Sequence, residues 1–186
     1  MESFNRKFAG SLLFVGGIQF LVAMIIAEAL YPGYSISSNY ISDLGVGPSA
    51  IVFNSSVFLF GLAIVISSYY IQRIFRNLLI SILVASAGVG AAGVGLFPET
   101  VPFLHYAFSF TTFFFGALSA IASYKIQKSP LSYFSVLMGI VSLTASALFA
   151  TDNDLGLGIG GMERIIAYPI ILWAVSSGAH MIGQSG

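Results

Sequence analysis

Asp43 and His105 are the two side chains of this sequence best suited to acid–base chemistry or to metal binding. Asp43 belongs to a polar segment after the first apolar stretch, and His105 follows a tight turn that precedes the fourth. A carboxylate beside an imidazole supports general acid–base catalysis, and such a pair with further carboxylates holds a hard divalent ion. The alternative for His105 is a hydrogen-bonded histidine at a membrane interface. We therefore take Asp43 and His105 as candidate catalytic residues.

Five further polar residues are candidate ligand-binding residues: Asn39, Ser42, Asn54, Glu163 and Arg164. Asn54 lies within an apolar stretch, where an unpaired amide is costly, so we expect it to bind loop backbone or Asp43. Arg164 stands in the first turn of a predicted helix, where its charge opposes the helix dipole. It should be held by a carboxylate or by an anionic ligand such as a lipid phosphate, so an ion pair that joins loops and a ligand-binding role both stay open. The candidate carboxylates are those of Asp43, Asp152, Asp154 and Glu163.

The sequence lacks residues that several kinds of site require, so those sites are excluded. It has no Cys, which removes disulfides, iron–sulfur clusters and cysteine zinc sites. Its other histidine, His180, falls near the opposite end of a different predicted span, so a bis-histidine haem and a three-histidine zinc site are excluded for a monomer. No Gly-x-Ser-x-Gly motif marks a nucleophile. No cofactor is expected, although a divalent metal held by His105 and carboxylates stays open.

The composition indicates which solvent these residues face. Hydrophobic residues make up 57 % of the 186 residues and charged residues only 8 %, whereas a soluble domain carries about a quarter charged residues. The chain could not cover a water-facing surface, so it is a membrane protein and not a soluble enzyme. Seven Lys and Arg balance seven Asp and Glu, which excludes a nucleic-acid partner bound through net charge.

The hydrophobic stretches predict the elements that position the candidate residues. A helix needs about 20 apolar residues to cross a bilayer, and six stretches reach about that length. They are residues 8–31, 49–71, 77–97, 101–124, 131–150 and 165–182. Little sequence lies between them, so residues 1–186 are expected to form one domain. The predicted fold is all-α, a bundle of six transmembrane helices.

Charge placement orients this predicted bundle. Basic residues precede the first span and lie between spans two and three and between spans four and five: Arg6, Lys7, Arg73, Arg76, Lys125 and Lys128. All of them fall on one side if the spans alternate, and by the positive-inside rule that side is the cytoplasm. Both termini are then cytoplasmic in a multi-pass protein of the cell membrane. Most acidic residues, including Asp43 and Glu163, fall at the outer ends, as do His105 and the exceptional base Arg164.

Three parts of the sequence resemble a known family. The residues are Asn39-Tyr40-Ile41-Ser42-Asp43-Leu44-Gly45 with Asn54 and Gly61, then Leu96-Phe97-Pro98 followed by His105, and finally Gly161-Met162-Glu163-Arg164. Together they resemble the prokaryotic membrane proteins of domain-of-unknown-function family 998. The Ile-Ser-Asp element is also distantly similar to one in eukaryotic six-span proteins linked to GPI-anchor remodelling and autophagy modulation. The first resemblance implies a six-span fold and the same candidate positions, Asp43, His105, Glu163 and Arg164, without a chemistry.

The expected function follows from a polar outer cluster on a lipid-embedded bundle. The favoured interpretation is an integral membrane protein that binds a lipid head group there or serves as a structural or regulatory component. The alternative is a membrane-embedded lipid hydrolase or transferase that uses Asp43 and His105. A small-solute transporter is least favoured, because no ionisable group is expected near the bilayer centre. Membrane lipids are the expected partners, and a homo-oligomer stays open.

Overall fold

The computed structural model describes residues 2–184, and within this range it contains six α-helices and no β-strand. The helices are α1 (Glu2–Leu30), α2 (Ala50–Phe75), α3 (Leu78–Leu96), α4 (Pro102–Ala122), α5 (Leu131–Phe149) and α6 (Gly158–Gly183). Short 3₁₀ turns occupy Ser42–Gly45, Gly47–Ser49 and Ser123–Lys125. The all-α prediction is therefore confirmed.

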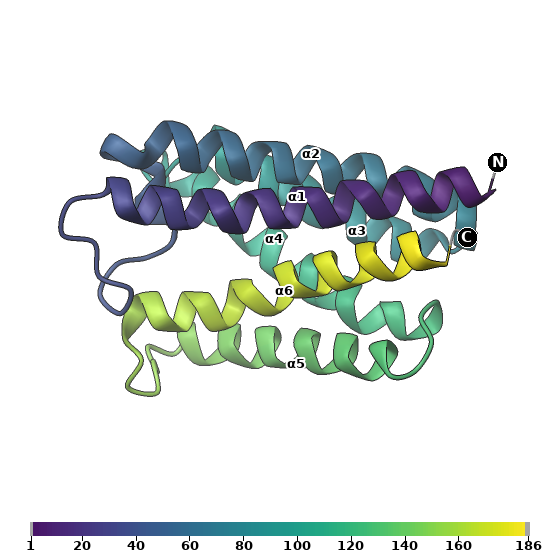
Figure 1. The fold of residues 1–186 in the computed structure, drawn as a ribbon. Helices are drawn as coiled ribbons and strands as arrows, with labels where there is room; N and C mark the ends of the chain where they lie inside the picture. Colours follow the sequence, from purple (N-terminus) through teal and green to yellow (C-terminus); the bar gives the residue numbers. More distant parts are fainter. Residues whose placement is uncertain (1, 185–186) are drawn as a thin grey trace.

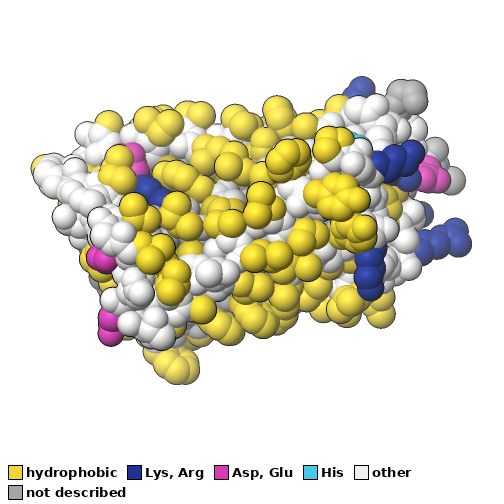
Figure 2. Space-filling view, turned by 90° about the horizontal axis from the view of Figure 1, so that it is seen from below, with side chains coloured by type: hydrophobic (Ala, Val, Ile, Leu, Met, Phe, Trp, Pro, Cys, Tyr) yellow, Lys and Arg dark blue, Asp and Glu magenta, His cyan; other side chains and the backbone are white. Residues whose placement is uncertain are grey.

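Each α-helix of the described range is long and apolar enough to cross a membrane. Hydrophobic side chains cover the middle of the molecular surface, and the charged side chains gather at its two ends (Figure 2). Both chain termini lie at one end of the bundle (Figure 1). We call the opposite end, which carries the loops after α1, α3 and α5, the distal end. The chain is thus an integral, multi-pass membrane protein.

The helices form a closed ring. Each packs against the next one along the chain, and α6 packs against α1 (Figure 1). Close packing holds such helices together, because lipid offers no hydrophobic driving force between them. Gly61 of α2 shows this most clearly, since a Cβ atom there would lie 2.2 Å from the backbone nitrogen of Ala92 in α3. Only glycine permits that approach.

The beginning of α6 differs from the expectation. The hydrophobic stretch predicts the last span at residues 165–182, but α6 begins at Gly158 and includes the glycine-rich residues that precede that stretch. The long loop after α1 lies against this first turn, where the Gly160 amide donates to the Ser37 carbonyl oxygen at 3.0 Å. A Cβ atom on Gly160 would lie 1.9 Å from the Asn39 carbonyl oxygen. Glycine here allows loop and helix backbones to touch, and it places Glu163 and Arg164 beneath the loop instead of at a helix start.

Candidate functional site

Arg164 lies buried at the distal end, where it joins three segments of the chain. Its Nη2 atom donates to Glu28 Oε1 of α1 at 2.6 Å and to the Tyr34 hydroxyl at 2.8 Å. Its Nη1 atom donates to the carbonyl oxygens of Ile36 and Gly160, at 3.1 and 2.9 Å. Burial raises the pKa of Tyr34 to about 12, although the adjacent guanidinium opposes the rise. Arg164 therefore ties α1, the first loop and α6 together.

The carboxylate that pairs with Arg164 is not among the four expected ones. Asp43, Asp152, Asp154 and Glu163 make no ion pair with it, and the salt bridge is to Glu28. Glu28 lies in the last turn of α1, so alternation of the spans alone places it at the same end of the bundle. Glu163, the candidate adjacent to Arg164 in sequence, does not pair with it, because adjacent helix residues point in different directions and do not face each other.

The first loop owes its shape to three of the candidate residues. Asp43 Oδ2 accepts from the Asn39 side-chain amide at 2.8 Å and from the Tyr40 backbone amide at 3.0 Å. Asn54 donates from Nδ2 to the Gly45 carbonyl oxygen at 2.9 Å, so the prediction that it binds loop backbone is confirmed. These bonds fold the loop back over the bundle and hold Ser42 and Asp43 towards its interior.

Three carboxylates from different segments converge under this loop. Glu163 accepts from the Ile41 backbone amide, and Glu99 accepts from the Ser42 hydroxyl. Asp43, Glu99 and Glu163 thus each have one oxygen atom bonded to the loop. The carboxyl groups of Asp43 and Glu99 also share a hydrogen bond with each other, whereas the second oxygen of Glu163 has no hydrogen-bond partner in residues 2–184. That oxygen is not among the unpaired polar atoms that are sealed from solvent. The second oxygen of Glu163 is therefore open to the space beneath the loop, and the Asp43–Glu99 pair borders the same space.

Glu99 was not among the predicted site residues, although it lies at their centre. It belongs to the short turn between α3 and α4. Burial, supported by the charge of Asp43, raises its pKa, while the Ser42 hydrogen bond and His105 oppose the rise. The sequence feature that could have identified Glu99 is its position: it lies six residues before His105, at a predicted outer end of the spans.

His105 is buried in the first turn of α4, with 3 % of its surface exposed. Its Nδ1 atom lies 2.9 Å from the Phe97 carbonyl oxygen. Because a carbonyl only accepts, Nδ1 carries a proton, and in the neutral form of the ring Nε2 has a lone pair. Nε2 has no hydrogen-bond partner within the described range, and His105 and Asp43 are not bonded to each other. The imidazole thus presents an acceptor and a base.

Asp43, Glu99, His105 and Glu163 share one cavity of about 520 Å³, which we call the distal cavity. The wall also includes aromatic and aliphatic side chains of α4, α5 and α6: Phe110, Phe113, Phe114, Leu143, Phe149 and Ile166. At its rim, Tyr106 and Phe110 are 69 % and 64 % exposed on the face of α4 that lipid would cover. The distal cavity is therefore polar at one end, apolar along its length and bordered by the lipid-facing surface.

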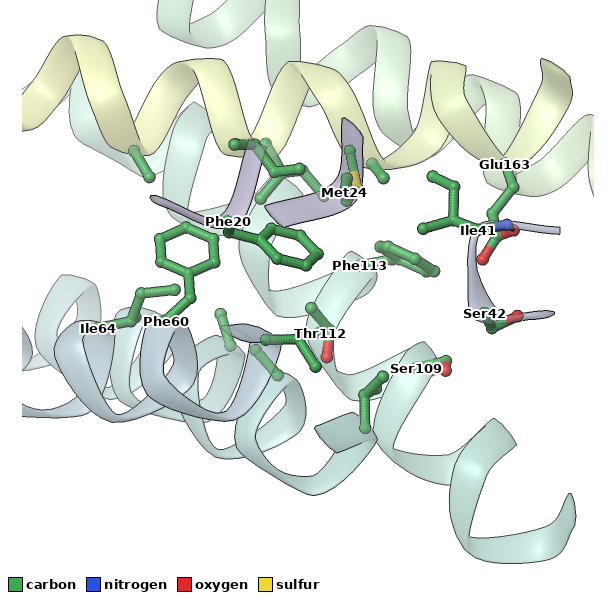
Figure 3. Close-up of a pocket in the computed structure, with 18 of the residues that line it drawn as sticks. Phe20, Met24, Ile41, Ser42, Phe60, Ile64, Ser109, Thr112, Phe113 and Glu163 are labelled. Atoms are coloured by element: carbon green, nitrogen blue, oxygen red, sulfur yellow. Dashed lines mark hydrogen bonds between the residues drawn. The ribbon is translucent and has the colours of Figure 1, made fainter. Parts of the chain in front are cut away.

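A second and smaller cavity of about 70 Å³ lies in the centre of the helix ring. Its wall shares Ser42, Ser109, Phe113 and Glu163 with the distal cavity. Figure 3 shows Glu163 and Ser42 at one end of it, Phe20 and Phe60 at the other and Phe113 between them. The two spaces thus adjoin across these shared side chains.

A metal centre does not emerge from the side chains around these cavities. Within residues 2–184 no three His, Asp or Glu side chains are grouped so that they could hold a metal ion together. The arrangement suits proton exchange and the binding of hydrogen-bond donors better than metal coordination.

Comparison with known proteins adds a family match. A family model described as a protein of unknown function (DUF998) matches residues 14–180. That range runs from α1 into α6 and includes every residue of the distal cavity. No curated protein and no solved structure matches the chain. The match therefore covers both the bundle and its candidate site.

Proposed function

The chain belongs to the DUF998 family, and from its own geometry we propose that it binds a membrane amphiphile in the distal cavity. The observation that carries the proposal is one cavity with carboxylates and a histidine at one end and aromatic walls along the rest. Its volume of about 520 Å³ lies in the range of small-molecule sites, about 300–1,000 Å³. Such a space matches a polar head group attached to an alkyl chain.

The lateral position of the cavity supports binding from the membrane. Tyr106 and Phe110 belong to its wall and are also exposed on the outer face of α4. A bound alkyl chain would therefore pass from the bilayer between aromatic side chains without crossing water. The head group would stay at the level of Asp43 and Glu99, near the end of the helices, where a bilayer has its polar interface.

We further propose that the distal end faces away from the cytoplasm. The basic side chains near the end that holds the termini are Arg6, Lys7, Arg73, Arg76, Lys125 and Lys128. The positive-inside rule assigns that end to the cytoplasm of a cell membrane. The distal cavity would then serve lipids of the outer leaflet.

A second candidate function is hydrolysis or group transfer on the bound amphiphile. His105 favours it, because its Nε2 lone pair is unclaimed by the protein and the ring lines the cavity. An imidazole in that state can take a proton from water or from a hydroxyl group. Asp43 would act through the local electric field and not by a direct bond to His105, since its Oδ2 atom holds the loop.

Photolabelling of the purified protein in bilayer nanodiscs tests amphiphile binding. The probes are three alkyl chains of equal length, each carrying a diazirine, that end in a primary ammonium, a glycerol or a phosphate group. We expect at least one probe to label the cavity wall at Phe110, Phe114 or Leu143 in a saturable manner. Saturation distinguishes a site from random contact with the lipid-facing surface.

Two serine variants provide the matched comparison. Ser146 lines the distal cavity, and Ser55 is exposed on α2; each hydroxyl donates to a carbonyl four residues earlier, at 2.8 and 2.6 Å. Ser146→Phe should fill the cavity and abolish saturable labelling, whereas Ser55→Phe should leave it unchanged. Labelling that never saturates with any probe, or that persists in Ser146→Phe, would overturn the proposed function.

A further inference from the structure

The polar groups that face the distal cavity are mostly hydrogen-bond acceptors. Glu163 presents a carboxylate oxygen that has no hydrogen-bond partner in residues 2–184, and the carboxyl groups of Asp43 and Glu99, which share one hydrogen bond, line the same cavity. His105 adds the Nε2 lone pair, because Nδ1 is occupied by the Phe97 carbonyl oxygen. Ionised carboxylates and a lone pair can accept hydrogen bonds but cannot donate them. A ligand that satisfies this end of the cavity must therefore bring donors.

The Ser42 hydroxyl does not change this balance, because its hydrogen is directed at Glu99. The hydroxyl groups of Tyr40, Tyr106 and Ser109 also line the cavity, and a hydroxyl can accept as well as donate. They are compatible with a donor ligand and do not require an acceptor. The Ser146 hydroxyl donates to the Ser142 carbonyl oxygen. The shortage of donors on the protein side thus persists when all polar groups of the wall are considered.

The same end of the cavity lacks a compensating cation. No Lys or Arg side chain belongs to the cavity wall within the described part of the chain. Arg164 is the nearest base in sequence, but its guanidinium is bound to Glu28 and Tyr34. Three carboxylates at short range repel a phosphate group and attract a positive charge.

We propose that the head group bound in the distal cavity is a hydrogen-bond-donating cation, a primary or secondary ammonium carried on an alkyl chain. This inference rests on the proposed function and names its ligand class. A primary ammonium has three N–H groups and a secondary ammonium has two, so it would donate to Glu163 and to one or two of the remaining acceptors on Asp43, Glu99 and His105. Its charge would be balanced where it binds. The ring of Tyr40, which also lines the cavity, offers a further attractive surface for a cation.

Competition among the three probes tests the head-group class in the wild-type protein. Labelling by the diazirine probe with the ammonium end is displaced with unlabelled chains of the same length that end in ammonium, glycerol or phosphate. We expect the ammonium chain to compete at a concentration at least tenfold lower than the glycerol chain, and the phosphate chain to compete least. A tenfold ratio is about 1.4 kcal/mol, the size of one favourable charge interaction at a partly buried site.

Glu99→Gln examines the contribution of one carboxylate. Glutamine keeps an oxygen that can accept the Ser42 hydroxyl, so the local hydrogen bond is retained while the charge is removed. We expect about tenfold weaker competition by the ammonium chain and little change for the glycerol chain. Asp152→Asn is the matched control, because Asp152 is an exposed acid of the distal end that lies outside the cavity.

The outcomes separate this inference from the proposed function. Equal competition by all three chains, or a preference for phosphate, would overturn the ammonium assignment and leave amphiphile binding intact. Absence of saturable labelling with every probe would overturn both. A loss in Asp152→Asn as large as that in Glu99→Gln would show that general surface charge attracts the ammonium, which also contradicts a cavity site.

Discussion

Replacement of Glu28 by glutamine should lower the free energy of unfolding by about 3 kcal/mol. Glu28 Oε1 lies 2.6 Å from Arg164 Nη2, and the two side chains are 22 % and 7 % exposed. Unit charges about 4 Å apart attract by about 4 kcal/mol at the effective dielectric constant of a protein surface region. The glutamine oxygen restores a neutral hydrogen bond of about 1 kcal/mol. The difference is the expected loss, and it agrees with the about 3–5 kcal/mol found when one partner of a buried pair is removed.

The control for this prediction is an exposed pair in the same protein. Glu2 and Arg6 form a 2.9 Å ion pair on α1, with side chains 67 % and 21 % exposed. Glu2→Gln should change the unfolding free energy by less than about 1 kcal/mol, because solvent screens such pairs. Unfolding is followed by titration with denaturing detergent, with the fluorescence of Trp173, the chain's single tryptophan, as the signal.

A double variant makes the same reasoning stricter. In the background of Arg164→Met, removal of the Glu28 charge should add little further destabilisation, since no buried cation is left without its partner. Equal effects of Glu28→Gln and Glu2→Gln would refute the structural role assigned to the buried pair. Full additivity of the Arg164 and Glu28 variants would refute it as well.

Two further predictions concern the loop over α6 and the turn before α4. Gly160→Ala should destabilise the protein by about 3 kcal/mol in the same detergent titration, because the new Cβ atom would lie 1.9 Å from the Asn39 carbonyl oxygen. The control is Gly183→Ala at the end of the same helix. It should be neutral, because a Cβ atom there meets open space. Burial raises the pKa of Glu99 in the folded protein above its ordinary value of 4.5. The folded state therefore gains stability from protonated Glu99. This gain is complete below pH 4.5 and is lost as the pH rises through the raised pKa. Titrations at several pH values should show this loss in the wild type and not in Glu99→Gln.

The bundle could be predicted because its signals are long and local. A run of about 20 apolar residues has few alternatives to a membrane helix, and the chain holds six of them within residues 2–184. The start of α6 could not be predicted in the same way, because glycine favours loops in any local rule. Gly158 to Gly161 are helical since the loop after α1 packs against their bare backbone, a contact between segments more than 100 residues apart.

The polar site was likewise predictable in part from the sequence. The sequence placed Asp43, His105, Glu163 and Arg164 at one end of the bundle, and the structure brings the first three to the distal cavity. It could not assign Arg164 its partner, because several acids at that end were equally suitable by charge. Helix rotation decides the matter: Arg164 faces α1 and meets Glu28, whereas Glu163, the preceding residue, faces the cavity.

This difference in direction explains how an acidic cavity can persist beside an arginine. If the guanidinium of Arg164 pointed towards α4, it would neutralise part of the charge of Asp43, Glu99 and Glu163, and the cavity would suit an anionic or a neutral head group. Glu28 instead holds Arg164 on the other side of α6. Clustered carboxylates raise the free energy of the empty protein through mutual repulsion and burial. If the ligand is a cation as proposed, its binding would recover that energy. The Glu28–Arg164 pair would then contribute to cation selectivity by keeping the guanidinium of Arg164 out of the cavity.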